Sequence, residues 1–440
     1  MRIRTKMKMY SCVFGVNLMK STNIFLEIVR YTHSIIFSDR FIRKATKRPM
    51  DFTRNRKMSF TDYIFAIIKG TKSSLQASIY TFFESMKKED MEYSKQAFSK
   101  GRQRIKPEAF RDLFQGTVDK FYEKADSTTW RNHHLLGIDG TRINLPCTET
   151  LKEIYGGQTT TGTPQVQALA SCLYDLLNGM IVDVRIGGCK SSEQDAAKNI
   201  IECFDEQKIK NPLFIMDRGY PSAVLIDTLI RKNHKFVLRC SSEFFKKMKS
   251  SNPDKIIDYQ FQKLKYPLKV RVIQLQLSPQ NTEYLITNLF DSDLSVNDFS
   301  DLYHMRWGIE TKYDDIKNKL EIENFTGSSP DAILQDFYAT LFLANLAGAL
   351  EFDLRDEIEA AHSKPVNKYK YRMNTNMTIS ELKRTVIEML ITGSNLKRLK
   401  LFGRMKRRLM KAVVPVRPNK VYPRIKRHIA AKFSQNSKRP

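Results

Sequence analysis

Two stretches, LLGIDGTRINLP at residues 135–146 and LFIMDRGY at residues 213–220, decide how this chain folds. In each, an apolar run of strand length ends in an aspartate, Asp139 or Asp217, followed by glycine or by Arg-Gly. Ligand sites of open α/β sheets are built at the carboxyl ends of their strands. An Asp-Gly turn after a strand usually has no chemical role, so neither aspartate alone identifies a site. Together the two stretches predict an α/β fold.

The segments around these two strands alternate between strand and helix patterns. Asn178-Gly179 favours a tight turn between two apolar runs, which predicts a hairpin after the first strand. A β-rich stretch at about 235–290 separates Asp217 from a long helix pattern further on. The predicted bounds are 165–174 and 180–186 for the hairpin, 192–204, 221–232 and 296–320 for helices, and 235–239, 268–277 and 284–288 for strands.

A third stretch, YHMRWGIETKYDDIKNKLEIENFTG at residues 303–327, carries polar residues at fixed spacing on that long helix: Tyr303, Arg306, Glu310 and Lys317. At about 100° per residue, all four lie within a roughly 60° stripe beside an apolar stripe that would pack on the sheet. Asp314 falls on the same face and is an alternative to Glu310. The plainest alternative is a solvated face with an Arg306/Glu310 ion pair worth a few tenths of a kcal/mol.

With the two aspartate segments upstream, the pattern Tyr-x2-Arg-x3-Glu-x6-Lys resembles the signature of bacterial insertion-sequence transposases of the DDE type, the large family four of those elements. The likeness extends from about residue 94 to about residue 350. It implies a ribonuclease H-like mixed sheet with flanking helices, a β-rich insertion and a helical N-terminal domain. The implied metal-binding catalytic triad is Asp139, Asp217 and Glu310, and the residues implied to position transposon-end DNA are Tyr303, Arg306 and Lys317.

Carboxylates suit the chemistry that this resemblance implies. Cleaving a phosphodiester requires charge stabilisation on the attacking and leaving oxygens, which two carboxylate-bound divalent ions provide in many nucleases. We therefore expect two Mg²⁺ ions, replaceable by Mn²⁺, because hard cations prefer oxygen ligands. The implied partner is double-stranded DNA, both transposon ends and target, and holding two ends at once implies at least a dimer on DNA. The implied activity is cut-and-paste transposition: binding of terminal inverted repeats, cleavage and strand transfer.

Two other functions remain open at this point. Another ribonuclease H-like nuclease would share the metal site without needing terminal repeats, although the motif spacing argues against it. A catalytically inactive or repurposed transposase would keep only DNA binding, although the intact triad argues against it. Some relatives hold a flipped base on a tryptophan of the insertion. This insertion contains none, which leaves Tyr259 and Tyr266 as weak candidates.

Composition supports a polyanionic partner. The chain has 74 Lys and Arg against 47 Asp and Glu, a formal net charge of +27, and such a field favours nucleic acid. Its six scattered cysteines form no zinc-binding pattern, which fits a reducing, cytosolic setting. The resemblance implies a location in the bacterial cytoplasm, at the nucleoid. The apolar run at 337–350 is shorter than the roughly 20 residues of a membrane span, so we expect a buried core helix and no membrane role.

Three regions are expected along the chain. Residues 1–127 form a helical N-terminal DNA-binding region, in which 94–114 predicts a basic helix followed by a second helix; a solvated hairpin explains that charge pattern equally well. Residues 128–362 form the catalytic core with its insertion. Residues 363–440 form a basic C-terminal region with its densest charge at 404–408, which we expect to contact phosphates.

Overall fold

The computed structural model describes residues 23–70, 74–88, 90–160, 163–244, 252–278, 281–363 and 369–417. The first 22 residues of the expected helical N-terminal region and the last part of the basic tail lie outside these ranges. Within them, five cysteines are free. Two short strands, β10 (Lys370–Met373) and β11 (Val413–Val416), pair with each other near the C-terminal end.

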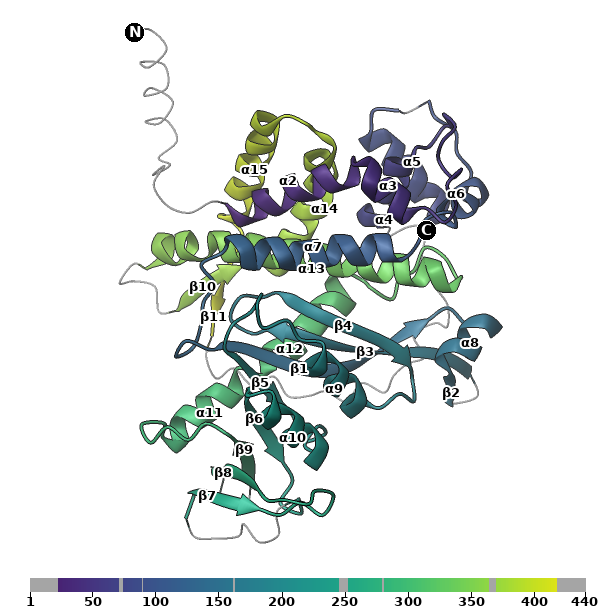
Figure 1. Cartoon of the computed structure of the whole chain (residues 1–440). Coiled ribbons are helices and arrows are strands. Elements are labelled where there is room, and N and C mark those ends of the chain that lie inside the picture. The colour runs from purple at the N-terminus through teal and green to yellow at the C-terminus, as the bar shows by residue number, and fades with distance from the viewer. Residues whose placement is uncertain are drawn as a thin grey trace.

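The described residues contain a nine-stranded mixed sheet in the order β2-β3-β1-β5-β6-β9-β8-β7, with β4 also paired to β3 (Figure 1). Strand β1 is antiparallel to β3 and parallel to β5, and β5 is parallel to β6. This confirms the expected ribonuclease H-like sheet, and strands β7 to β9 of the insertion extend it. The strands are β1 (His134–Leu145), β2 (Gly157–Thr160), β3 (Thr163–Asp175), β4 (Ile181–Gly188), β5 (Pro212–Met216), β6 (Lys235–Cys240), β7 (Asp254–Tyr259), β8 (Leu268–Ser278) and β9 (Asn281–Thr287).

Helices cover this sheet, and many begin at a serine whose side chain accepts a backbone N–H of the first turn, as Ser59 does for α4. The helices that precede β1 are α2 (Ile24–Ile36), α3 (Asp39–Ala45), α4 (Phe60–Lys69), α5 (Leu75–Ser85), α6 (Lys95–Arg102) and α7 (Glu108–Lys124). The later ones are α8 (Glu149–Tyr155), α9 (Glu193–Glu202), α10 (Ala223–Arg231), α11 (Val296–His304), α12 (Trp307–Asp314), the π-helical η2 (Asp315–Lys319), α13 (Pro330–His362), α14 (Thr375–Ile391) and α15 (Asn395–Leu409).

The central strands bury both faces, because alternate side chains point to opposite sides of a strand. Leu135, Leu213 and Ile215 pack in one cluster with Phe299 and Leu302 of α11. Their neighbours Leu136, Phe214 and Met216 belong to the larger core cluster, which also holds buried residues of α9 and α10. By the same alternation, Asp139 and Asp217 share the face that α11 covers.

Helices α7 and α13 contact each other and lie between the sheet and an outer group of helices that includes α2, α4 and α14 (Figure 1). Buried Asn345 of α13 holds this layer to the sheet: its side chain accepts from Ile181 N at 2.8 Å and donates to Ile181 O and to Thr117 Oγ1, both at 2.9 Å. Gly348 lets the helix approach closely, since a Cβ there would lie 2.4 Å from Gly179 O.

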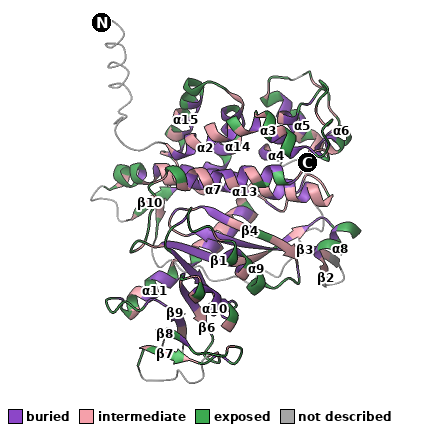
Figure 2. Ribbon diagram, viewed as in Figure 1, coloured by how far each residue is buried: buried purple, intermediate pink, exposed green. Residues whose placement is uncertain are grey.

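Helix α13 is the one helix of the described ranges long and apolar enough to cross a membrane. Its most apolar window is 83% buried inside the fold, and Figure 2 shows the buried residues along it. This confirms the expectation of a buried core helix at 337–350.

The single helix predicted over 296–320 is wrong in detail. Helix α11 ends at His304, and α12 begins at Trp307 after a tight turn in which Arg306 N bonds to Tyr303 O at 3.1 Å. A π-helical segment then follows, closed by Leu320 N on Asp315 O at 2.9 Å. Uniform periodicity cannot predict these changes, because it assumes one helical repeat along the whole segment.

Candidate active site

Asp139 and Asp217 lie on neighbouring parallel strands. Ile138 of β1 is in register with Met216, the last residue of β5, so the two aspartates occupy equivalent positions one residue later. Strand β1 continues beyond Asp139, which is paired with Cys172 of β3, whereas β5 ends before Asp217. The parallel pairing therefore places the two carboxylates side by side on neighbouring strands. The first strand, expected to end at Asp139, continues to Leu145 because it stays paired with β3.

Tyr313 attaches helix α12 to the strand that carries Asp139. Its hydroxyl donates to the backbone carbonyl of Asp139 at 2.5 Å and accepts from Cys172 N at 3.2 Å. A Cβ added at Gly137 would lie 3.8 Å from the Cβ of Ile309 on α12, which is an ordinary contact distance, so α12 packs directly against β1. The helix that carries Glu310 is thus held directly over β1.

Arg306 lies among the three predicted ligands. It is 2% exposed and donates from Nη2 to Glu310 Oε1 at 2.9 Å. Its positive charge also acts on both aspartates, lowering the pKa of Asp139 and of Asp217 relative to burial alone. Arg306 therefore supplies positive charge to all three carboxylates in this arrangement.

Asp217 also has partners of its own. Its Oδ1 accepts from the Arg218 amide at 2.6 Å, from the Tyr303 hydroxyl at 3.1 Å and from Arg239 Nη1 at 3.4 Å. Arg239 in turn pairs with Glu283 at 2.6 Å. Tyr303 is therefore brought to the predicted site, where it orients an acidic side chain.

The two aspartates have opposite pKa shifts. Burial raises the pKa of Asp139 to about 6, and the charges of Glu310 and Glu193 act in the same direction. Burial also acts to raise the pKa of Asp217, but its hydrogen bonds and the two nearby guanidinium groups outweigh burial and lower it. A carboxylate whose charged form is disfavoured by burial and by like charges gains from an added cation.

The other predicted residues are more dispersed. Lys317, on η2, donates to Arg142 O at 2.7 Å and so lies beside β1 beyond Asp139. Asp314, the alternative third carboxylate, is exposed and accepts from Asn318 of η2. Of the base-holding candidates, Tyr266 donates to Asp227 at 2.7 Å and Tyr259 packs edge-on against Phe261 at 4.8 Å.

Sequence reasoning missed two further side chains at this edge. Glu193, at the start of α9, packs over Gly140, where a Cβ would lie 2.9 Å from its Oε1. Tyr220 is buried, and its hydroxyl has no hydrogen-bond partner among the described residues. Burial raises the pKa of Tyr220, as do the charges of Asp139 and Glu193. Neither residue stands at a motif spacing, although Tyr220 follows the Asp-Arg-Gly turn directly.

The residues present fit a divalent cation in chemistry. Among the described residues, no group of three or more His, Cys, Asp or Glu side chains stands at ligand geometry, because Glu310 is turned to Arg306 and Asp217 to Tyr303. The donors are nonetheless carboxylate oxygens, which hard cations prefer. These carboxylates share the single guanidinium of Arg306 and lie near the buried hydroxyl of Tyr220. Arg306 alone does not neutralise three carboxylates, so their oxygens can also accept a divalent cation.

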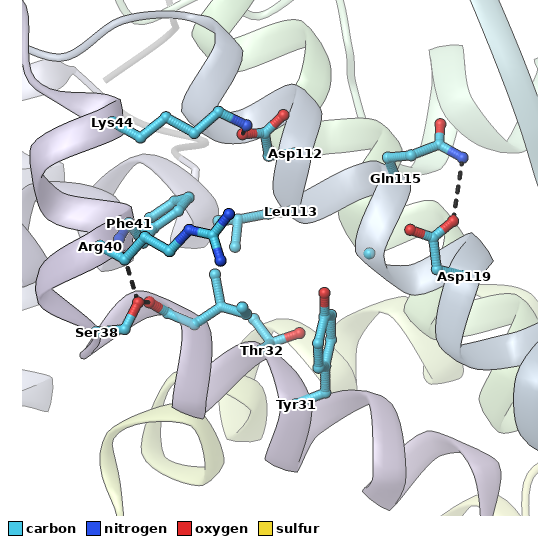
Figure 3. Close-up of a pocket in the computed structure, with 12 residues that line it drawn as sticks. Tyr31, Thr32, Ser38, Arg40, Phe41, Lys44, Asp112, Leu113, Gln115 and Asp119 are labelled. Atoms are coloured by element: carbon cyan, nitrogen blue, oxygen red, sulfur yellow. Dashed lines mark hydrogen bonds and ion pairs between the residues drawn. The ribbon is translucent and has the colours of Figure 1, made fainter.

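A separate cavity of about 350 Å³ lies between α2, α3 and α7 in the helical part of the molecule (Figure 3). Arg40, Lys44 and Asp112 are among its lining residues, and Lys44 and Asp112 form an ion pair. None of the predicted site residues lines it. It takes no part in the carboxylate chemistry.

Comparison with known proteins gives relatives of one kind. The chain is 25% identical over 266 residues to the transposase InsG for insertion sequence element IS4 of Escherichia coli (strain K12), covering 57% of this chain and 59% of that protein. The chain thus matches somewhat under two thirds of the relative's length. Among solved structures it is similar to a cryo-EM structure of the piggyBac transposase synaptic complex with hairpin DNA, at 11% identity and a TM-score of 0.44, covering 90% of this chain and 87% of that one.

A family comparison covers the site itself. Residues 125–346, just over half of the 440 residues, match the family described as the transposase DDE domain. The matched region runs from just before β1 into α13 and contains Asp139, Asp217 and all of α12. The chain therefore belongs to the transposase DDE domain family.

Proposed function

We propose that this protein is a DNA transposase that binds the terminal inverted repeats of its insertion sequence and catalyses metal-dependent DNA cleavage and strand transfer. The observation that carries the proposal is the gathering of three carboxylates, from β1, the end of β5 and α12, around the buried guanidinium of Arg306. Family membership and a net charge of +27 support DNA as the substrate.

Asp139, Asp217 and Glu310 would hold the metal, with Mg²⁺ the expected ion, Mn²⁺ able to replace it, and two ions per site. When bound, the two ions would stabilise charge on the attacking and leaving oxygens of the phosphodiester. Tyr303 positions Asp217 through its hydroxyl, which donates to Oδ1 at 3.1 Å. Arg306 keeps Glu310 at the sheet edge and limits repulsion among the carboxylates.

Lys317 is assigned to a DNA phosphate. It lies beside β1, with its ammonium group 2.7 Å from Arg142 O, and an ammonium group binds phosphate as a compact point charge. Two transposon ends must be held at once, so the active assembly on DNA is at least a dimer. The proposed location is the bacterial cytoplasm, at the nucleoid. The region boundaries at 127 and 362 remain predictions.

The test is cleavage of a duplex that carries the DNA flanking this reading frame, by the purified full chain with Mg²⁺ or Mn²⁺. Asp139→Asn, Asp217→Asn and Glu310→Gln should each abolish cleavage, because each removes charge from a metal ligand, while DNA binding is retained. Asp314→Asn is the matched control: it removes a carboxylate one turn from Glu310 that bonds to Asn318, and cleavage should persist.

Each other outcome has a definite meaning. Cleavage at the wild-type rate by a triad variant would remove that residue from the site. A loss of cleavage in Asp314→Asn with cleavage retained in Glu310→Gln would reverse the assignment of the third carboxylate. Metal-dependent cleavage without regard to the terminal repeats would indicate a different ribonuclease H-like nuclease. Binding without cleavage in the wild type would indicate a DNA-binding protein.

A further inference from the structure

A cleft of about 540 Å³ opens where α4, α5, η2 and α14 meet. Helix α14 packs against both α4 and η2, so the cleft joins the N-terminal and C-terminal helices to the catalytic helix segment. Four cations line it: Lys69, Lys319, Lys383 and Arg384. The other lining residues are mainly hydroxyl and amide groups, and none is acidic: Gly70, Ser78, Thr81, Asn318, Asn376, Ile379 and Ser380. We refer to this feature as the α14 cleft.

Two cations of the α14 cleft pair with acidic side chains of their own helices. Lys319 pairs with Asp315, and Arg384 pairs with Glu381. Each acid is more buried than its partner: the Glu381 side chain is 10% exposed against 54% for Arg384, and that of Asp315 is 18% exposed against 25% for Lys319. These acids orient the cationic side chains and leave them accessible from the cleft.

Two hydrogen bonds hold the other two cations of the cleft, Lys69 and Lys383. Lys69 donates to Thr81 O at 2.9 Å, which fixes its ammonium group between α4 and α5. Lys383 donates to Leu320 O at 3.4 Å, which ties α14 to the end of η2. Lysine, arginine, serine, threonine and asparagine are the side chains that typically contact phosphate oxygens of DNA. The lining therefore suits a phosphodiester backbone.

The cleft is mechanically connected to the proposed catalytic site. Helix α12 runs directly into η2, so Lys319 follows Glu310 by nine residues on one continuous helical segment. At about 1.5 Å of rise per residue this is roughly 13 Å. That distance equals about four base pairs of DNA rise at about 3.4 Å each. Along the helix axis, the cleft and the proposed catalytic site are therefore separated by a length that a short DNA segment spans. π-helical turns such as η2 occur often at functional sites.

We propose that the α14 cleft binds the phosphodiester backbone of DNA a few nucleotides from the cleavage site, and that this contact holds η2 and α12 in position. The inference rests on the proposed function for the identity of its DNA, but the binding it describes can be measured without cleavage.

The test measures binding of the full chain to a short fluorescent duplex by anisotropy over a series of salt concentrations. The cleft variant carries Lys319→Gln, Lys383→Gln and Arg384→Gln. The matched control carries Lys124→Gln, Lys152→Gln and Lys198→Gln, three surface cations that pair with carboxylates on their own helices. Both variants lose three charges, so their net charges change equally. Ser380→Glu adds a negative charge at an exposed lining position.

The cleft variant should bind about tenfold or more weakly than the control. Its slope of log affinity against log salt should be shallower by about 0.9 for each DNA phosphate that the variant no longer neutralises. Ser380→Glu should also weaken binding, with circular dichroism and melting as in the wild type. Equal affinities and slopes for the cleft and control variants would overturn the proposal and leave the proposed function standing. Displacement of DNA by micromolar inorganic phosphate at constant ionic strength would overturn DNA as the occupant. Absence of cleavage by the wild type would refute the proposed function alone.

Discussion

Replacing Arg306 by glutamine should make the stability of this protein depend much more strongly on divalent metal. The guanidinium is 2% exposed and pairs with Glu310 at 2.9 Å, while its charge also acts on Asp139 and Asp217. Removing one partner of a buried ion pair costs about 3–5 kcal/mol, whereas an exposed pair contributes about 0–1 kcal/mol. The Glu310 side chain is 33% exposed, so we expect an intermediate loss of about 2–3 kcal/mol without metal.

Metal should then recover much of that loss, because the carboxylates of the variant no longer share a protein cation. A tenfold gain in metal affinity stabilises the folded state by about 1.4 kcal/mol at saturation. The assay is thermal or urea unfolding of wild type, Arg306→Gln and Arg306→Lys, in EDTA and across a Mg²⁺ or Mn²⁺ titration. Arg306→Lys keeps the charge and should fall between the other two. If Mg²⁺ stabilises wild type and Arg306→Gln equally, Arg306 does not compensate these carboxylates and the reasoning fails.

Three smaller predictions concern other parts of the fold. Arg102→Met should destabilise by about 3–5 kcal/mol in urea unfolding, because it leaves Asp336 without its buried ion-pair partner at 2.8 Å; a normal midpoint would contradict this role. Burial raises the pKa of Asp353 to about 6 from 3.8, so the folded state binds its proton more tightly and its contribution to stability falls as pH rises from about 4 to about 6, by up to roughly 3 kcal/mol. Asp353→Asn should remove that slope, and a pH profile parallel to the wild type would count against it. Glutamine at Lys400, Arg404 and Arg407 on α15 should flatten the salt dependence of DNA binding if this helix binds phosphates, by about 0.9 per phosphate in log units; an unchanged slope would mean a merely solvated helix.

The proximity of Asp139 and Asp217 was predictable from sequence, because the geometry of neighbouring strands leaves few alternatives. Residues 135, 137 and 139 lie on one face of β1, as 213, 215 and 217 do along β5, so the alternation of side chains places both aspartates on the same face when the strands pair in this register. The hairpin at Asn178-Gly179 was equally determined, because Gly179 adopts a φ of 74° that few other residues accept. Local rules sufficed wherever the determining residues were close in sequence.

The remaining parts of the site depend on partners that are distant in sequence. Arg102 lies in a basic stretch that suggested DNA contact, yet it is 2% exposed and bonds to Asp336, 234 residues away. Tyr313 gave no sign that its hydroxyl would hold the carbonyl of Asp139. The buried position of Arg306 was also unpredictable, since an i,i+4 pair with Glu310 is typical of solvated helices. Composition and spacing show which residue types are present, whereas the roles of these residues depend on whether they are buried.

The helix that carries the signature shows how linear spacing and spatial arrangement can separate. On a uniform helix, the four signature residues form one stripe at about 100° per residue. The π-helical turn at η2 includes an extra residue, closed by Leu320 N on Asp315 O, so later residues are displaced by about 100° from that projection. Lys317 contacts the backbone of β1 at Arg142, while Asn318 and Lys319 line the α14 cleft. One short segment thus directs polar groups both to the strand of Asp139 and to the helical part of the molecule.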